Sequence, residues 1–191
     1  MGAFKDYLAA SRDALSAAMS SLDEARIEQA AAAMHGALAK DKPLLICGNG
    51  GSAADAQHIA GELVGRYLKE RRALRAMALA ADAAVLTAWS NDYSYDTVFA
   101  RQVEAHGEAG GVLLALSTSG NSKNVILAAA AARKKGMLVV ALTGAGGGKL
   151  ASASNILIDV PATATPLIQQ LHLCVYHYLC AEIEARIAAG T

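Results

Sequence analysis

The feature that most constrains how this 191-residue chain folds is a regular alternation, after Pro43, of short apolar runs and helical patterns. Each run has the length of a strand, and several end at Gly, Ser or Asn. Because the runs are apolar on both faces, they are typical of a parallel sheet that is covered by helices on both sides. We predict strands at 44–47, 76–79, 112–116, 138–142 and 156–160, with helices around 52–66, 83–90, 95–107, 122–136 and 165–188.

A different pattern occupies the first forty residues, where apolar residues recur at spacings of three, four and seven. This spacing predicts two amphipathic helices. No repeat or low-complexity linker divides the chain, and the Gly-rich stretch 144–148 is interpreted as a turn. We therefore predict a doubly wound α/β fold with a five-stranded parallel sheet, in one domain over residues 1–191. Residues 1–42 form an N-terminal helical hairpin for oligomer packing, and residues 43–191 form the α/β core and C-terminal helix.

Charge and cysteine content argue against several classes of protein. Lys plus Arg equal Asp plus Glu at 17 each, so no global field gathers nucleic acid or an acidic membrane. The apolar runs are interrupted before the ~18 residues that a membrane span needs, and charges occupy the region where a signal peptide is apolar, so we predict a cytoplasmic protein. The three cysteines form no disulfide framework and are expected to be reduced, buried thiols: Cys47, Cys174 and Cys180.

A serine-rich loop follows the third predicted strand and leads into an Ala-rich helix. Ligands of doubly wound sheets bind at the carboxyl ends of strands, and a helix start offers unpaired N–H groups to an anion. Gly120 allows a positive φ or a close backbone approach. Asn121 or Ser122 alone could simply cap the helix, but one cap does not need so many hydroxyls, so we favour a phosphate site. Its candidate ligands are Ser117, Thr118, Ser119, Asn121 and Ser122.

Gly48-Asn49-Gly50-Gly51-Ser52, after the first strand, is a second loop that leads into a helix. Its glycines could approach a polar ligand closely, or the loop could be a tight turn alone. The serine-rich loop lacks the Gly-Lys-Ser/Thr of a Walker motif and is no Gly-x-Gly-x-x-Gly motif. A monophosphate ligand therefore suits the chain better than a nucleotide.

His58 and Glu62 are four residues apart on the helix after this second loop, so their side chains share one face. Such a pair could bind a metal, act in acid–base catalysis or form a surface ion pair, and the spacing alone favours the surface pair. Their position beside the Gly-rich loop favours a functional site instead. Arg66, Arg71 and Arg72, slightly further on, are interpreted as a solvated face.

The stretch from Cys47 to Tyr67, with Ser117–Ser122 and Leu142-Thr-Gly, resembles the phosphoheptose isomerases of the sugar isomerase (SIS) family over nearly the whole chain. That resemblance implies a cytoplasmic enzyme that interconverts sedoheptulose 7-phosphate and D-glycero-D-manno-heptose 7-phosphate, at the entry to ADP- or GDP-heptose synthesis for lipopolysaccharide or another glycan. It also implies a homotetramer, with one zinc ion in each subunit, whose partner is a small sugar phosphate rather than nucleic acid or a membrane.

The resemblance further implies the residues of the site. The implied zinc ligands, a set of nitrogen and oxygen donors, are His58, Glu62, Gln169 and His177. The implied substrate-binding residues, besides the serine-rich loop, are Asn49, Gly50, Gly51, Ser52, Glu62, Asn91, Asp92 and Gln169. The eight residues between Gln169 and His177 rise ~12 Å on an ideal helix, so either the helix start is distorted or the two lie in neighbouring ligand shells. His172 is a less suitable ligand, and for either His172 or His177 taken alone a histidine satisfied in the core is the simpler explanation.

Aldose–ketose isomerisation needs a base for the carbon-bound proton, an acid–base group for the oxygen protons and stabilisation of an enediolate. Our hypothesis assigns the first role to Glu62, the second to His177 and the third to zinc. Some relatives carry an acidic residue, linked to opening of the sugar ring, close to Thr165-Pro166, where this chain has Ala164.

Two other functions compete with this hypothesis. One is a non-catalytic SIS module that binds a replication initiator, and the other is a different sugar-phosphate isomerase or an amino-sugar etherase of the same family. The non-catalytic branch lacks equivalents of Glu62 and His177, so the presence of both residues favours an enzyme.

Overall fold

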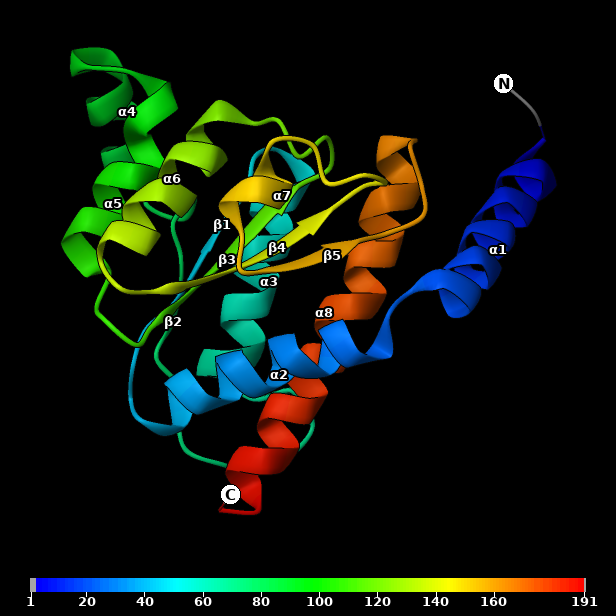
Figure 1. The fold of residues 1–191 in the computed structure, drawn as a ribbon, viewed down its shortest axis with the longest axis horizontal. Coiled ribbons are helices and arrows are strands. Elements are labelled where there is room, and N and C mark those ends of the chain that lie inside the picture. Colours follow the sequence, from blue (N-terminus) through cyan, green and yellow to red (C-terminus); the bar gives the residue numbers. More distant parts are fainter. Residues whose placement is uncertain (1–2, 191) are drawn as a thin grey trace.

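The computed structural model describes residues 3–190 as a central sheet with helices on both faces (Figure 1). All five strands are parallel and follow the order β2-β1-β3-β4-β5. The strands are β1 (Leu44–Cys47), β2 (Ala76–Ala78), β3 (Val112–Ser117), β4 (Leu138–Thr143) and β5 (Ile156–Asp159). The helices are α1 (Phe4–Ser21), α2 (Glu24–Ala39), α3 (Gly51–Val64), α4 (Ala83–Asp92), the 3-10 turn η1 (Tyr95–Thr97), α5 (Val98–His106), α6 (Lys123–Lys134), α7 (Leu150–Ala153) and α8 (Thr165–Ala188). The predicted doubly wound α/β fold is confirmed.

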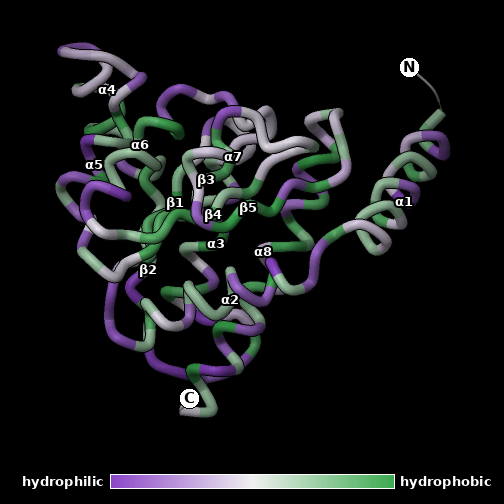
Figure 2. Tube along the Cα trace, viewed as in Figure 1, coloured by the Kyte–Doolittle hydropathy of each residue, from purple (hydrophilic) through white to green (hydrophobic). Residues whose placement is uncertain are grey.

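Successive strand residues belong to two different cores, one on each face of the sheet. In β1, Leu44 and Ile46 pack with α2, α3 and α8, whereas Leu45 and Cys47 pack with α5 and α6. Both sets are fully buried, which explains why the strands have continuous apolar sequences rather than an alternating pattern. Figure 2 shows the same concentration of hydrophobic residues at the centre of the fold.

The strand order creates a switch point between β1 and β3. The chain leaves β1 for α3 on one face of the sheet and leaves β3 for α6 on the other face. In doubly wound sheets the crevice outside the strands at such a point is where ligands bind. The Gly-rich loop and the serine-rich loop are the two loops that flank it.

Three local features differ from the sequence prediction. The segment predicted as one helix over 95–107 is divided into η1 and α5, because Ser94 accepts a hydrogen bond from the N–H of Asp96 and starts a tight turn. The one-turn helix α7 was not predicted, since four residues are too few to show a helical period. Cys47 and Cys180 are buried as expected, but Cys174 is exposed on α8, so the expectation of a buried thiol is wrong there.

The two predicted N-terminal helices are present, and both contact α8. In Figure 1, α1 points away from α2 rather than folding back along it. Ala18 is the one buried residue of the described part of α1, whereas Phe4 and Met19 are 74% and 88% exposed. Within residues 3–190, no helix combines the length and hydrophobicity that crossing a membrane requires.

Candidate active site

The serine-rich loop connects the end of β3 to the start of α6 beside the switch point. Ser117 Oγ and Ser122 Oγ lie 3.0 Å apart, and the hydroxyl of Ser119 accepts a hydrogen bond from the N–H of Asn121 at 3.1 Å. Ser117 is buried, Ser119 and Asn121 are exposed, and Thr118 and Ser122 are half-buried. The loop therefore holds accessible hydroxyls close to a helix N-terminus.

The start of α6 bears on the choice between an anion site and a simple helix cap. Ser122 is at the N-cap position, but its side chain makes no capping hydrogen bond and its hydroxyl faces Ser117. The Asn121 side chain donates to the carbonyl of Ser119 at 2.9 Å and accepts the N–H of Lys149 at 3.1 Å. Neither of these side chains caps α6, and Asn124 Oδ1 accepts only the N–H of Val125 at 3.0 Å, so the N–H groups of the first two helical residues remain available to an anion.

Gly120 is required at its position in this loop. Its φ is +65°, and a Cβ there would collide with the carbonyl oxygen of Gly147. Its own carbonyl accepts the N–H of Leu150 at 2.9 Å. The serine-rich loop is thus packed backbone to backbone against the Gly-rich stretch 144–148, which fixes its conformation.

The Gly-rich loop after β1 leads to a second helix start that no side chain caps. Gly50 is the N-cap of α3 and has a φ of +56°. A Cβ on Gly51 would collide with the carboxamide of Gln169, so glycine lets α8 approach the start of α3 closely. Ser52 is only 3% exposed. Through Gly51, the loop therefore contacts Gln169 in the second turn of α8.

Asn49 links the two loops, and its partners were not predicted from the sequence. Its Oδ1 accepts hydrogen bonds from Asn124 Nδ2 and from the Tyr95 hydroxyl, both at 2.8 Å, and its Nδ2 donates to Asn124 Oδ1 at 2.9 Å. Asn124 is a buried residue in the first turn of α6. Asn49 therefore holds the Gly-rich loop against the helix that follows the serine-rich loop.

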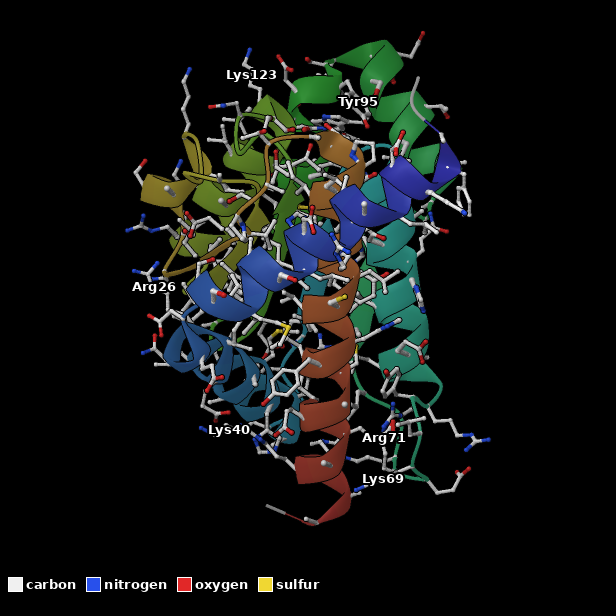
Figure 3. The ribbon with its side chains drawn as sticks, turned by 90° about the vertical axis from the view of Figure 1, so that its right-hand side faces the viewer. Arg26, Lys40, Lys69, Arg71, Tyr95 and Lys123 are labelled. Carbon is white, nitrogen blue, oxygen red and sulfur yellow. The ribbon has the colours of Figure 1, made fainter. Side chains whose placement is uncertain are left out.

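Asn91 and Asp92 are the last two residues of α4 and are both exposed. Asn91 Nδ2 donates to Asp92 Oδ1 at 2.9 Å. Just beyond them, Tyr95 reaches Asn49, and Lys123 at the start of α6 pairs with Asp96 at 2.7 Å. Figure 3 shows Tyr95 and Lys123 at the same end of the molecule. The segment after α4 is thereby attached to the candidate site.

His58, Glu62 and His177 form a cluster between α3 and α8. His58 Nε2 lies 2.9 Å from Glu62 Oε1 and 3.5 Å from His177 Nε2. The side chain of Glu62 is 21% exposed and that of His58 is 43% exposed. The spacing of His58 and Glu62 alone had favoured a surface ion pair, but the structure adds an imidazole from a distant part of the chain.

Tyr176 and Asp55 support this cluster, and no motif in the sequence pointed to them. The Tyr176 hydroxyl donates to Asp55 Oδ1 at 3.3 Å and lies 3.2 Å from His58 Nδ1. When the hydroxyl accepts the Nδ1 proton of neutral His58, Nε2 is left with a lone pair directed at Glu62 and His177. Burial raises the pKa of Asp55, opposed by the Tyr176 hydrogen bond and by His58.

The cluster fits a zinc ion. One ligand atom from each of the three residues lies within 4.8 Å of the others. The 3.5 Å between the two imidazole nitrogens is close to the ~3.3 Å edge of a tetrahedron with bonds of ~2.0 Å. Two imidazoles and one carboxylate are donors that zinc accepts, and the second nitrogen of a metal-bound histidine commonly has a hydrogen-bond partner, as His58 does with Tyr176.

Gln169 and His172, also on α8, lie outside the cluster. Gln169 contacts Gly51 at the start of α3, whereas His58 is two turns further along that helix. The helix runs without interruption from Thr165 to Ala188, so a distorted start does not explain the spacing of Gln169 and His177. His172 is fully buried, and burial lowers its pKa to about 4, opposed by the backbone of Thr143. It is a neutral core histidine at pH 7.

The predicted solvated face of arginines is wrong for Arg71. Its side chain is 1% exposed and lies 3.5 Å from the carboxylate of Glu184 on α8. Arg66 is exposed and pairs with Glu70 at 3.4 Å, and Arg72 is also exposed, as expected. Composition alone does not separate these residues, because the partner of Arg71 belongs to a distant helix.

This fold is that of an SIS domain: the family model described as SIS domain matches residues 6–144. The chain is 56% identical to the phosphoheptose isomerase of Rhodospirillum rubrum over 158 residues, which cover 83% of this chain and 84% of that protein. Among solved structures, it is similar to phosphoheptose isomerase GmhA from Neisseria gonorrhoeae, with 44% identity and a TM-score of 0.89, over 95% of this chain and 96% of that one. A phosphoheptose isomerase from Francisella tularensis gives 37% identity and a TM-score of 0.90 over the same shares.

The chain therefore belongs to the phosphoheptose isomerases of the SIS domain family. This membership makes it an isomerase and decides against the non-catalytic module that competed with this assignment.

Proposed function

We propose that this protein interconverts sedoheptulose 7-phosphate and D-glycero-D-manno-heptose 7-phosphate by an enediol mechanism. The observation that carries the proposal is the cluster of His58, Glu62 and His177, which joins a base, a proton carrier and a metal-binding set at one point. The names of the relatives at 56% and 46% identity support the substrate.

The phosphate of the substrate binds at the serine-rich loop. The hydroxyls of Ser117, Thr118, Ser119 and Ser122 and the side chain of Asn121 are its ligands, together with the free backbone N–H groups of the first two residues of α6. Helix N-termini and hydroxyls bind a phosphate dianion without a full positive charge nearby. Asn49, Gly50, Gly51, Ser52, Asn91, Asp92 and Gln169 bind the sugar chain between this loop and the cluster.

Glu62 removes the proton from the carbon next to the carbonyl and returns it to the neighbouring carbon. His177 carries the proton between the two oxygens, so that the hydroxyl and the carbonyl exchange places with no net loss of atoms. Glu62 is only 21% exposed, which limits exchange of its proton with solvent. His58, Glu62 and His177 would hold one zinc ion, and bound zinc would stabilise negative charge on the substrate oxygens.

The protein acts in the cytoplasm as a homotetramer. An apolar groove of about 710 Å³ between α1, α2 and α8 supports assembly with further copies, because it is lined by Leu15, Met19, Leu22 and Val175 among others. Exposed Phe4, Tyr7 and Leu8 extend the apolar surface along α1. Packing of these helices against their equivalents in other subunits would remove this surface from water.

The test is an NMR assay of sedoheptulose 7-phosphate with purified protein, before and after treatment with a chelator. We expect conversion by the untreated protein, a loss of about 100-fold after chelation, as several kcal/mol of charge stabilisation imply, and recovery on adding Zn²⁺. Fructose 6-phosphate in parallel examines the alternative of another sugar-phosphate isomerase. Conversion of that sugar alone, or of neither sugar, would contradict the proposal.

A further inference from the structure

A buried carboxylate on α8 binds the backbone of the segment that follows α3. Glu184 accepts hydrogen bonds from the N–H of Tyr67 at 2.6 Å, from that of Leu68 at 2.8 Å and from that of Lys69. Its side chain is 2% exposed. Burial raises the pKa of Glu184, but the three backbone N–H groups and Arg71 outweigh this effect and lower the pKa below its ordinary value. Glu184 is therefore a charged group inside the protein.

Arg71 is the counter-charge, and it also binds the end of α3. Its Nη2 donates to the carbonyl of Glu62 and its Nη1 to the carbonyl of Gly65, both at 2.6 Å. Arginine commonly binds the free carbonyls in the last turn of a helix in this way. Figure 3 shows Arg71 between the C-terminal half of α8 and the segment that follows α3. One guanidinium thus joins the last turn of α3 to a carboxylate of α8.

The same two helices, α3 and α8, also carry the residues of the cluster. His177 and Glu184 are seven residues apart on α8, so they share one face two turns apart. Glu62 contributes its carboxylate to the site and its carbonyl to Arg71. The ring of Tyr67, whose N–H binds Glu184, has its centroid 5.6 Å from that of His177. The buried pair is therefore connected to each side of the site through the backbone and through one aromatic ring.

We propose that Arg71 and Glu184 are positioning residues for catalysis, in that they fix the end of α3 against α8 so that Glu62 faces His177. The inference rests on the proposed function, because it concerns the same base and proton carrier. Displacement of a catalytic group by about 1 Å is enough to lower turnover about 100-fold.

A purely structural role is the alternative, because removing one partner of any buried ion pair destabilises a protein. The two roles differ in what they do to turnover in protein that remains folded. The test compares Glu184→Gln, which keeps the shape of the side chain, with Arg71→Lys, which keeps the charge but offers one ammonium in place of a planar fork. The control is Glu182→Gln, the same change on α8 at a residue that pairs with Arg186 on its own helix at 3.2 Å.

The values of kcat and KM for sedoheptulose 7-phosphate are measured well below the melting temperature of each variant. We expect kcat to fall about 10- to 100-fold in Glu184→Gln and in Arg71→Lys, with KM changed less than about threefold, and no change in Glu182→Gln. Hydrogen exchange of the Tyr67, Leu68 and Lys69 amides should rise in Glu184→Gln alone. If Glu184→Gln does not fold, the comparison of Arg71→Lys with the control Glu182→Gln tests the inference.

Unaltered kcat in a folded variant with a lowered melting temperature would overturn the inference and leave the proposed function intact. A matching loss of kcat in Glu182→Gln would overturn it as well. Absence of turnover in the unaltered protein would overturn the proposed function and this inference with it.

Discussion

The serine-rich loop and the cluster between α3 and α8 are built in opposite ways. The loop is six consecutive residues, Ser117–Ser122, whose shape depends on neighbours in the chain and on one close approach by the stretch 144–148. The cluster takes two residues from α3 and one from α8, and it exists only because both helices pack on the same face of the sheet. A binding element can thus be local in sequence, whereas the acid–base element depends on the whole fold.

This contrast implies that the loop and the cluster have separate functions, which can be tested. If the loop binds and the cluster reacts, a change in one should leave the other intact. Binding of inorganic phosphate reports on the loop without chemistry, and turnover reports on both.

The largest effect is expected for Glu62→Gln. Loss of the base should lower kcat about 1,000-fold or more, because general base catalysis contributes 100- to 10,000-fold. Affinity for inorganic phosphate, measured by calorimetry, should change less than about twofold. Glu70→Gln is the matched control, since Glu70 is a carboxylate in the nearby segment that is 87% exposed. Turnover within tenfold of that of the unaltered protein would show that Glu62 is not the base.

Zinc content should be measured in the same samples, because Glu62 is also a proposed ligand. A variant that keeps its zinc and loses turnover separates the base from the metal site. Parallel loss of phosphate binding would show that the loop and the cluster are not independent.

The second effect is expected for Ser122→Asp. Aspartate caps helices as well as serine does, so the melting temperature should change little. A carboxylate beside a bound phosphate costs several kcal/mol, so affinity for inorganic phosphate should fall about 100-fold or more. Ser122→Asn, a neutral cap, should retain most of the affinity. Equal affinities in the two variants would support the capping explanation against the anion site.

Prediction from sequence succeeded where the cause is local or repeated. The strands were predicted to within one residue at each end, because burial on both faces produces uninterrupted apolar runs such as Leu44–Cys47. That the serine-rich segment is a loop leading into a helix could also be inferred from adjacent residues, whereas its role as a phosphate site stays a prediction. The direction of α1 could not be inferred, since it depends on packing against α8 and not on the pattern of α1 itself.

The cluster required information that spacing does not contain. His58 and Glu62 could be paired by helical geometry, but His177 entered only through the resemblance to a known family. Arg71 was predicted to lie on the surface because its sequence neighbours are charged. Its partner, the carboxylate of Glu184 on α8, is distant in sequence although close in space. Tyr176 and Asp55 had no signal of any kind, since hydrogen bonds between helices leave no period in the sequence.

The smallest effect on turnover is expected for His172→Leu. This substitution distinguishes the role of His172 from that of His177, the other histidine of α8. His172 has a folded pKa of about 4, below the unfolded value of 6.5, so between these values the unfolded state binds more protons. Its contribution to stability is present above pH 6.5 and is lost as the pH falls toward 4. The unaltered protein should therefore lose about 2 kcal/mol more unfolding free energy than the variant between pH 7.5 and pH 5. Denaturant unfolding at both pH values measures this difference.

Turnover of His172→Leu at pH 7.5 should stay within about threefold of that of the unaltered protein, because His172 lies in the core. A loss comparable to that of Glu62→Gln would instead make His172 part of the reacting cluster.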